Sequence, residues 1–148
     1  MINEWLWEDA SGVNGPEPQK TVFLLINKLA TSEHRIVLIE GSPFDQKAWR
    51  LCKGDSAIVR AIVKVFVNSL RQNIDRCQIL KSEPAVPIPE ELAAATKHDD
   101  HYLLEAQQSV QGSIIVTTDG TLCEAVRKAC LPCLFREEFL ENYFQPIG

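Results

Sequence analysis

The stretch KHDDHYLLEAQQSVQGSIIVTTDGTL, residues 97–122, carries the sequence signals that decide the fold. Its first part predicts a helix, and SIIVTTD (113–119) is a short run rich in β-branched residues that is closed by an acid and a glycine. Such a run is typical of a buried strand that ends in a turn. GTLCEAVRKA (120–129) predicts a second helix. The order helix, strand, helix indicates part of a parallel α/β sheet.

The same alternation continues on both sides of this stretch. Apolar residues at i, i+3, i+4 and i+7 predict a helix over 19–32, and HRIVLIE predicts a buried strand over 34–40. Further helices are predicted over 44–51, 54–73, 89–109 and 136–144, and the helix over 89–109 has a break near Lys97 or His98. Further strands are predicted over 77–82 and 131–135. Residues 83–89 are predicted to form an extended proline-rich loop. We expect a single α/β domain over residues 1–148, with three layers and a mainly parallel sheet of about four strands.

Two of the predicted helices carry recognisable start signals. Ser42 is a candidate N-cap, with Pro43 suited to the first helical position. Asp55 or Ser56 is a candidate N-cap for the helix over 54–73. The residues of that helix predicted to share one face are Ile58, Ile62, Val65 and Leu70.

The charge and the start of the chain limit the function classes. The chain has 15 basic and 20 acidic residues and a net charge of −5, with no long run of either sign. This weakens the case for tight nonspecific binding to duplex nucleic acid, but not for a short RNA strand held by local basic residues and a metal. MINEWLWEDASG (1–12) is unlike a secretory signal, and no apolar run approaches the roughly 20 residues that span a bilayer. We expect a cytoplasmic protein without membrane contact.

The cysteines are most simply explained as core residues. The chain contains five of them, Cys52, Cys77, Cys123, Cys130 and Cys133. An odd number without a secretory signal predicts reduced thiols. CLPC (130–133) has the spacing of a redox motif, but it ends a predicted helix, whereas a redox motif opens one. Core thiols are therefore favoured, and a thiol redox protein that uses Cys130 and Cys133 is the third hypothesis. With Cys123 these residues supply three of the four ligands of a zinc site.

Three acids are candidates for a metal site. Asp119 ends a predicted strand and so lies at the carboxyl edge of a parallel sheet, where ligands bind. Asp99 and Asp100 head a predicted helix. Each acid taken alone is most simply a helix cap. Acids from different elements that share one edge repel one another unless a cation compensates, and their hard oxygens suit Mg²⁺ or Mn²⁺.

The motifs DDHYLLEAQQSVQGSIIVTTDGTL (99–122) and LPCLFREEFL (131–140) resemble the second half of a PIN domain. LLINKLATSEHRIVLIEGSPFDQKAWRL (24–51) is similar to the helix, strand, Ser-Pro turn and helix of the toxin-like PIN group. The resemblance implies a metal-dependent ribonuclease whose three or four acids meet at the sheet edge. It places the helix-head acid on Asp100, with Asp99 as a substitute, and the Thr-x-Asp motif on Thr117 and Asp119.

The chain departs from the family pattern in two places. The family opens with a strand that ends in Asp, whereas here only Asn3 and Glu4 are near that position and no apolar strand precedes them. The family also has an acid in the helix after the Ser-Pro turn; counting from the turn leads to Ala48, and Asp45 is displaced by about one helical turn. Either this is a short or degenerate PIN domain, or the true start lies upstream of Met1.

The leading hypothesis is therefore PIN-type hydrolysis of single-stranded or structured RNA with Mg²⁺ or Mn²⁺. Its metal ligands are Asp100 and Asp119, helped by Asp99, Glu4 and Asp45, and its substrate-binding residues are Thr117 and Asn3. The alternative is a non-catalytic PIN-like module that binds RNA or a protein such as an antitoxin, or that forms a homodimer. The remaining candidates are favoured as structural groups: His98 and His101 as surface residues, and Trp5, Trp7 and Trp49 as core or dimer-interface residues rather than base-stacking groups.

Overall fold

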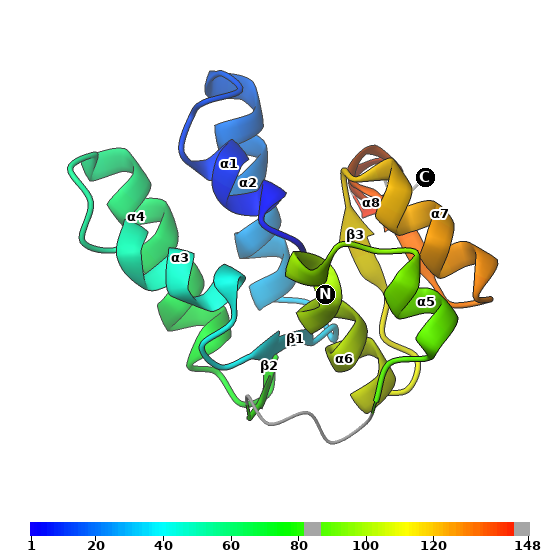
Figure 1. Ribbon diagram of the computed structural model, residues 1–148. Helices are drawn as coiled ribbons and strands as arrows, with labels where there is room; N and C mark the ends of the chain where they lie inside the picture. Colours follow the sequence, from blue (N-terminus) through cyan, green and yellow to red (C-terminus); the bar gives the residue numbers. More distant parts are fainter. Residues whose placement is uncertain (82–86, 144–148) are drawn as a thin grey trace. The chain divides into compact units, whose positions relative to one another are not determined.

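The computed structural model describes residues 1–81 and 87–143, and the chain divides into two compact units (Figure 1). One unit consists of Glu4–Ser82, and the other combines Met1–Asn3 with Glu83–Gly148. Over the described residues the structure is of mixed α/β type, with short parallel strands in two sheets of two strands each. This confirms the α/β class and the parallel strand direction. The proline-rich loop predicted over 83–89 and the end of the strand predicted over 77–82 fall partly outside the described residues.

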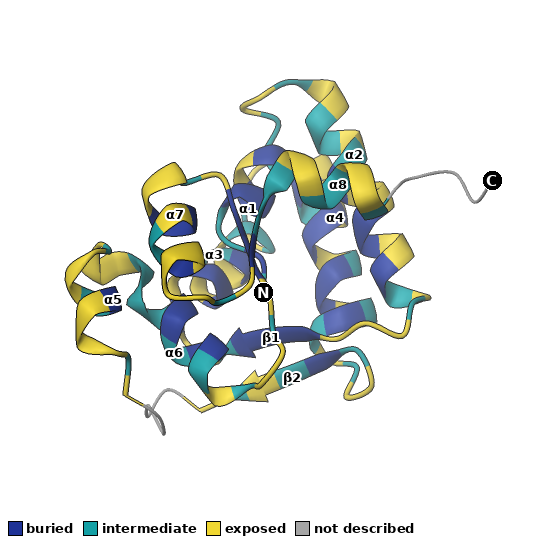
Figure 2. Cartoon of the chain, turned by 90° about the vertical axis from the view of Figure 1, so that its right-hand side faces the viewer, coloured by how far each residue is buried: buried dark blue, intermediate teal, exposed yellow. Residues whose placement is uncertain are grey.

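The unit Glu4–Ser82 contains one parallel pair of strands and the helices that precede and separate these strands. In chain order it consists of α1 (Trp5–Ala10), α2 (Pro16–Ala30), β1 (Ile36–Ile39), α3 (Pro43–Leu51), α4 (Ala57–Phe66), a π-helical turn η1 (Val67–Arg71) and β2 (Cys77–Leu80). β1 and β2 pair in parallel from Ile36 opposite Cys77 to Ile39 opposite Leu80. Figure 2 shows β1 largely buried and β2 partly exposed.

The start signals of α3 and α4 act as the sequence predicts. The hydroxyl of Ser42 accepts a hydrogen bond from the backbone N–H of Asp45 (3.4 Å), and Pro43 is the first residue of α3. The hydroxyl of Ser56 accepts from the N–H of Val59 (3.3 Å), so Ser56 rather than Asp55 caps α4. Each cap satisfies an N–H group that has no partner inside the helix.

An aromatic cluster forms the centre of this unit. The ring of Trp7 lies 5.0 Å from that of Phe44 and 4.8 Å from that of Phe66, centre to centre. Its indole N–H donates to the backbone carbonyl of Phe44 (3.0 Å), so the one polar atom of this buried ring is satisfied. The core prediction is confirmed for Trp5 and Trp7, whereas Trp49 is 39% exposed and is not a core residue.

The face that α4 buries differs from the predicted one by one position. The buried residues of this helix are Val59, Ile62, Val63 and Phe66. Ile58, which the sequence predicts on the buried face, is 63% exposed. Nearly every residue of α4 is apolar, so the sequence pattern did not distinguish the face toward the core from the neighbouring one.

The second unit is built around the other parallel pair. Its elements are α5 (Glu90–Ala94), a 3-10 turn η2 (His98–Asp100), α6 (His101–Ser109), β3 (Ile115–Thr117), α7 (Gly120–Lys128), β4 (Cys133–Phe135) and α8 (Arg136–Tyr143). β3 and β4 pair in parallel from Ile115 opposite Cys133 to Thr117 opposite Phe135. The break between α5 and α6 confirms the interruption predicted near Lys97 or His98.

The first three residues extend this second sheet. Ile2 forms a parallel bridge with Val116. The N–H of Val116 donates to the carbonyl of Met1 (2.8 Å), and the N–H of Asn3 donates to the carbonyl of Val116 (3.1 Å). Residues 1–3 therefore lie beside β3 as a short strand-like segment, although the sequence predicts no apolar strand there.

Candidate functional site

The carboxyl end of β3 brings three of the predicted residues together. Asn3 ends the segment that pairs with β3, and Thr117 is the last residue of β3 itself. The amide nitrogen Nδ2 of Asn3 donates to the hydroxyl oxygen of Thr117 (3.2 Å), and the same oxygen accepts from the backbone N–H of Asp119 (3.1 Å). The side chains of the two predicted substrate-binding residues and the backbone N–H of Asp119 thus meet at one hydroxyl oxygen.

Tyr102 completes this arrangement and is not among the residues predicted from the sequence. Its hydroxyl donates to the side-chain oxygen of Asn3 (3.3 Å). Thr117 is fully buried, whereas Asn3 and Tyr102 are half-buried, so the network reaches from the sheet to the surface. Tyr102 is the second residue of α6, close to the predicted acids in sequence, but nothing in the sequence pattern pairs it with Asn3.

Asp119 serves as the N-cap of α7. Its oxygen Oδ1 accepts hydrogen bonds from the backbone N–H groups of Thr121 (2.9 Å) and Leu122 (3.3 Å). The capping interpretation is therefore confirmed, and the negative charge lies at the positive end of the helix dipole. Both bonds end on Oδ1, so a cation would approach this carboxylate at Oδ2.

Asp99 and Asp100 lie in the 3-10 turn η2, directly before α6. Asp100 occupies the N-cap position of α6 but makes no capping hydrogen bond with its side chain, so the cap interpretation is wrong for this residue. The rings of His98 and His101 lie 5.3 Å apart, and Nε2 of His101 is 3.1 Å from the carbonyl of Ala93. His101 therefore contacts α5, and His98 is exposed.

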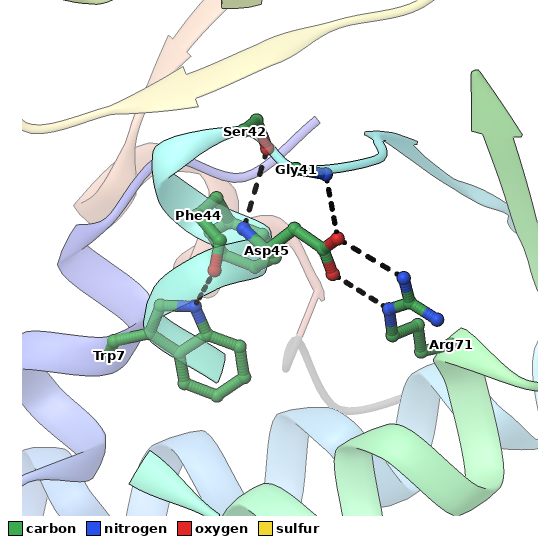
Figure 3. A network of polar contacts seen from close by, with 6 residues as sticks. All are labelled: Trp7, Gly41, Ser42, Phe44, Asp45 and Arg71. Carbon is green, nitrogen blue, oxygen red and sulfur yellow. Dashed lines mark hydrogen bonds and ion pairs between the residues drawn. The ribbon is translucent and has the colours of Figure 1, made fainter. Parts of the chain in front are cut away.

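Asp45 and Glu4 belong to the unit Glu4–Ser82, whereas Asp119 belongs to the other unit. Figure 3 shows Asp45 in a two-bond ion pair with Arg71: Nε lies 2.7 Å from Oδ1 and Nη2 lies 3.1 Å from Oδ2. Oδ2 also accepts from the N–H of Gly41 (2.9 Å). The pair is almost buried, with 3% of the Asp45 side chain and 12% of the Arg71 side chain exposed. Glu4 stands at the N-cap position of α1 without a capping bond.

The guanidinium of Arg71 is fixed on two sides. It bonds to Asp45, and its central carbon lies 4.8 Å from the ring centre of Trp49, within the range of a cation–π contact. The hydrogen bond to Asp45 is the main reason that the pKa of Arg71 is raised. Asp45 therefore connects the turn after β1 to the end of η1, and its carboxylate already has three donors.

The side chains of the described residues do not form the metal centre that the PIN resemblance implies. Within residues 1–81 and 87–143, no group of three or more His, Cys, Asp or Glu side chains is placed so that it could hold a metal ion. At the end of β3 the strand-like segment beside Asp119 presents the amide of Asn3, and Asp45 is bonded to Arg71. The predicted roles of the individual acids stay predictions.

The cysteines divide into buried and accessible thiols. Cys77, Cys123 and Cys133 are buried, Cys52 is half-buried and Cys130 is exposed, so the core prediction is wrong for Cys130. Burial raises the pKa of Cys77 to about 11 and also raises that of Cys133. As predicted, Cys130 follows a helix and Cys133 begins a strand.

The unit Glu4–Ser82 also has an apolar surface groove between α2 and α4, which is not among the sites predicted from the sequence. It has a volume of about 360 Å³. Its lining residues are Pro16, Gln19, Lys20 and Phe23 from α2 and Ile58, Ala61, Ile62 and Val65 from α4. The signal that could have revealed it is the nearly continuous apolar sequence of α4, which provides more apolar surface than one core-facing stripe needs.

No protein-family model, curated protein or solved structure matches this chain. Over the part of the chain that the structure describes, none of the helices combines the length and the apolar character required to cross a bilayer.

Proposed function

We propose that this chain is a PIN-like domain that functions as a non-catalytic protein-binding module, with the groove between α2 and α4 as its docking surface. The three-layer PIN-like arrangement with about four strands in one sheet is part of this proposal and rests on the sequence resemblance. The observation that carries the binding function is the apolar groove, where Phe23 is 42% and Ile58 is 63% exposed. Exposed apolar side chains that are grouped at one place, rather than scattered singly, are a feature of interaction sites.

The structure of α4 supports a partner on this face. The groove side of α4 consists of Ile58, Ala61, Ile62 and Val65, which follow the spacing i, i+3, i+4 and i+7. These residues form a second apolar stripe, which shares Ile62 with the stripe that packs in the core. A helix with apolar residues around most of its circumference is expected to be covered on more than one side.

The shape and charge of the groove favour an amphipathic helix as the partner element. Two helices form its walls, and an apolar helix face laid into such a groove is a common mode of peptide recognition. Lys20 is the charged residue among the groove-lining side chains, and it is exposed. We therefore expect the partner helix to carry apolar residues at i, i+3 or i+4, and i+7, together with an acid that faces Lys20.

The test is a selection of helical peptides on the full chain, followed by fluorescence polarisation with the selected sequences. Binding should require Ile58 and be lost in Ile58→Glu, because a charge in the groove opposes an apolar helix face. Ile74→Glu is the matched control, since Ile74 is 81% exposed and does not line the groove. Selected peptides that bind Ile58→Glu as tightly as the unmodified chain would refute the proposal. RNA binding that is insensitive to Ile58→Glu would instead favour an RNA-binding module.

Metal-dependent hydrolysis of RNA with Mg²⁺ or Mn²⁺ is the second candidate. The observation that favours it is the position of Asp119 just after β3, with Asp99 and Asp100 just before α6 in the same unit. Calorimetric titration with Mn²⁺ and a cleavage assay on single-stranded RNA test it. Saturable binding and cleavage that are both lost in the Asp100→Asn, Asp119→Asn double variant would establish it in place of the first candidate.

A further inference from the structure

The turn between α1 and α2 contains the dipeptide Asn14–Gly15, the one place in the chain where Asn precedes Gly. An Asn side chain at such a place reacts with the next backbone nitrogen, because glycine has no side chain that shields this nitrogen. Gly15 has a φ of 106°, which other residues rarely adopt, so the turn favours glycine here. Asn14 is exposed. The reactive pair is therefore a fixed part of the turn.

Both reacting groups are held by hydrogen bonds in the folded protein. Nδ2 of Asn14 donates to Oδ1 of Asp9 (2.8 Å), and the N–H of Gly15 donates to the carbonyl of Gly12 (3.0 Å). Reaction requires the nitrogen of Gly15 to lose its proton and to approach the side-chain carbon Cγ of Asn14. Each hydrogen bond must break for this step, and each therefore opposes it. The fold thus protects a dipeptide that is reactive in an unfolded chain.

We propose that Asn14 and Gly15 form a deamidation site that is closed in the folded protein and opens when the turn unfolds locally, so that conversion permanently marks chains that have opened there. In the reaction the nitrogen of Gly15 bonds to Cγ of Asn14, the bond from Cγ to Nδ2 breaks, and Nδ2 takes up a proton and leaves as ammonia. Water then opens the succinimide ring at either carbonyl, which leaves aspartate or isoaspartate at position 14. The proposal does not rest on the function proposed for the groove.

Conversion removes a bond that closes the turn. Asp9 is only 3% exposed, so water screens its carboxylate poorly. The amide of Asn14 donates to this carboxylate, whereas a carboxylate at position 14 only accepts hydrogen bonds and repels it. α1, which ends just before the turn, is buried over most of its length. The converted chain should therefore open more readily at this turn than the original one.

The rate of deamidation at Asn14 in the full chain tests the proposal. The chain is incubated at mildly alkaline pH with and without denaturing urea and then digested. Mass spectrometry of the peptide that contains Asn14 measures replacement of the amide by an acid. The folded protein should convert at least about tenfold more slowly than the unfolded chain, because it reacts only through local opening. Equal rates in the two conditions would overturn the proposal.

The stability of designed variants tests the contact between Asn14 and Asp9. Asn14→Asp should lower the midpoint of urea denaturation, whereas Asn68→Asp, which adds the same charge at an exposed position, should leave it nearly unchanged. Combining Asp9→Asn with Asn14→Asp exchanges donor and acceptor and should recover part of the loss. An unchanged midpoint in Asn14→Asp, or no recovery in the double variant, would contradict the effect proposed for conversion. If Asn14→Asp does not fold, the reaction rates of the unmodified chain still decide whether the site is protected.

Discussion

Asp45→Asn should destabilise the protein strongly, because Asp45 is the counter-charge of an almost buried arginine. The substitution keeps the size of the side chain and removes the charge that holds Arg71 at 2.7 Å and 3.1 Å. It also replaces one acceptor oxygen by an NH₂ group, which would face either the N–H of Gly41 or the guanidinium. Arg71, with 12% of its side chain exposed, would lose its paired carboxylate and keep the cation–π contact with Trp49.

The expected loss is about 3–5 kcal/mol of unfolding free energy, the usual range for breaking a buried ion pair by removing one partner. A domain has a total stability of about 5–15 kcal/mol, so the loss would be a large fraction of it. Arg71→Met should cost a similar amount, because it leaves the carboxylate of Asp45, with 3% of its side chain exposed, without its counter-charge. The double variant should then be more stable than the sum of the two single losses predicts.

Urea denaturation followed by tryptophan fluorescence measures these losses. Trp7 is well placed as a reporter, because its indole N–H donates to the carbonyl of Phe44, the residue before Asp45. Asp55→Asn is the matched control: Asp55 is exposed, and its substitution should change stability by no more than about 0.5 kcal/mol. A loss below about 1 kcal/mol for Asp45→Asn, with an unchanged denaturant slope, would refute the structural role.

Three further predictions concern single side chains. Asp119→Ala should lower stability by about 1 kcal/mol in urea denaturation, whereas Asp119→Asn should be nearly neutral, because Asn retains the cap; equal losses would contradict the capping role. In the folded protein at pH 8 an aromatic disulfide reagent should modify the exposed Cys130 first and the buried Cys77, Cys123 and Cys133 slowly, since burial raises the pKa of Cys77 to about 11 and also raises that of Cys133; equal rates before and after unfolding would argue against this order. The backbone N–H of Phe135 donates to Glu138 and lowers the pKa of that carboxyl. The contribution of Glu138 to stability is therefore present above the ordinary carboxyl pKa and is lost as the pH falls through the lowered value. A carbon NMR titration should show this low midpoint, and Glu138→Gln should flatten the dependence of stability on pH in the acid range.

Local signals in the sequence were sufficient for most elements of the fold. The strand IVLI and the caps Ser42 and Ser56 depend on residues that are close together in the chain, and the structure has them where expected. α1 was missed because nearly all of its residues are buried, so it shows no amphipathic period. The pairing of residues 1–3 with β3 was missed for a different reason: three residues are too few to display any periodicity.

The contacts that decide the roles of the predicted acids are long-range and leave no local signal. Arg71 is 26 positions from Asp45, and Tyr102 is 99 positions from Asn3. No spacing rule connects such residues. From the sequence alone, an aspartate that is paired with an arginine cannot be distinguished from an aspartate that binds a cation. The sequence therefore located candidate acids at the strand ends but did not show which of them have partners.

The existing bonds of each acid determine its capacity to bind a cation. An ionised carboxylate offers about four lone-pair positions on its two oxygens. Asp45 uses three of them, two for Arg71 and one for Gly41, so a cation would have to displace an arginine that is itself mostly buried. Asp119 uses two, both on Oδ1, and can accept a cation at Oδ2 while it still caps α7. Any cation binding that uses one of these two acids should therefore depend on Asp119, and should be insensitive to Asp45 except through loss of stability.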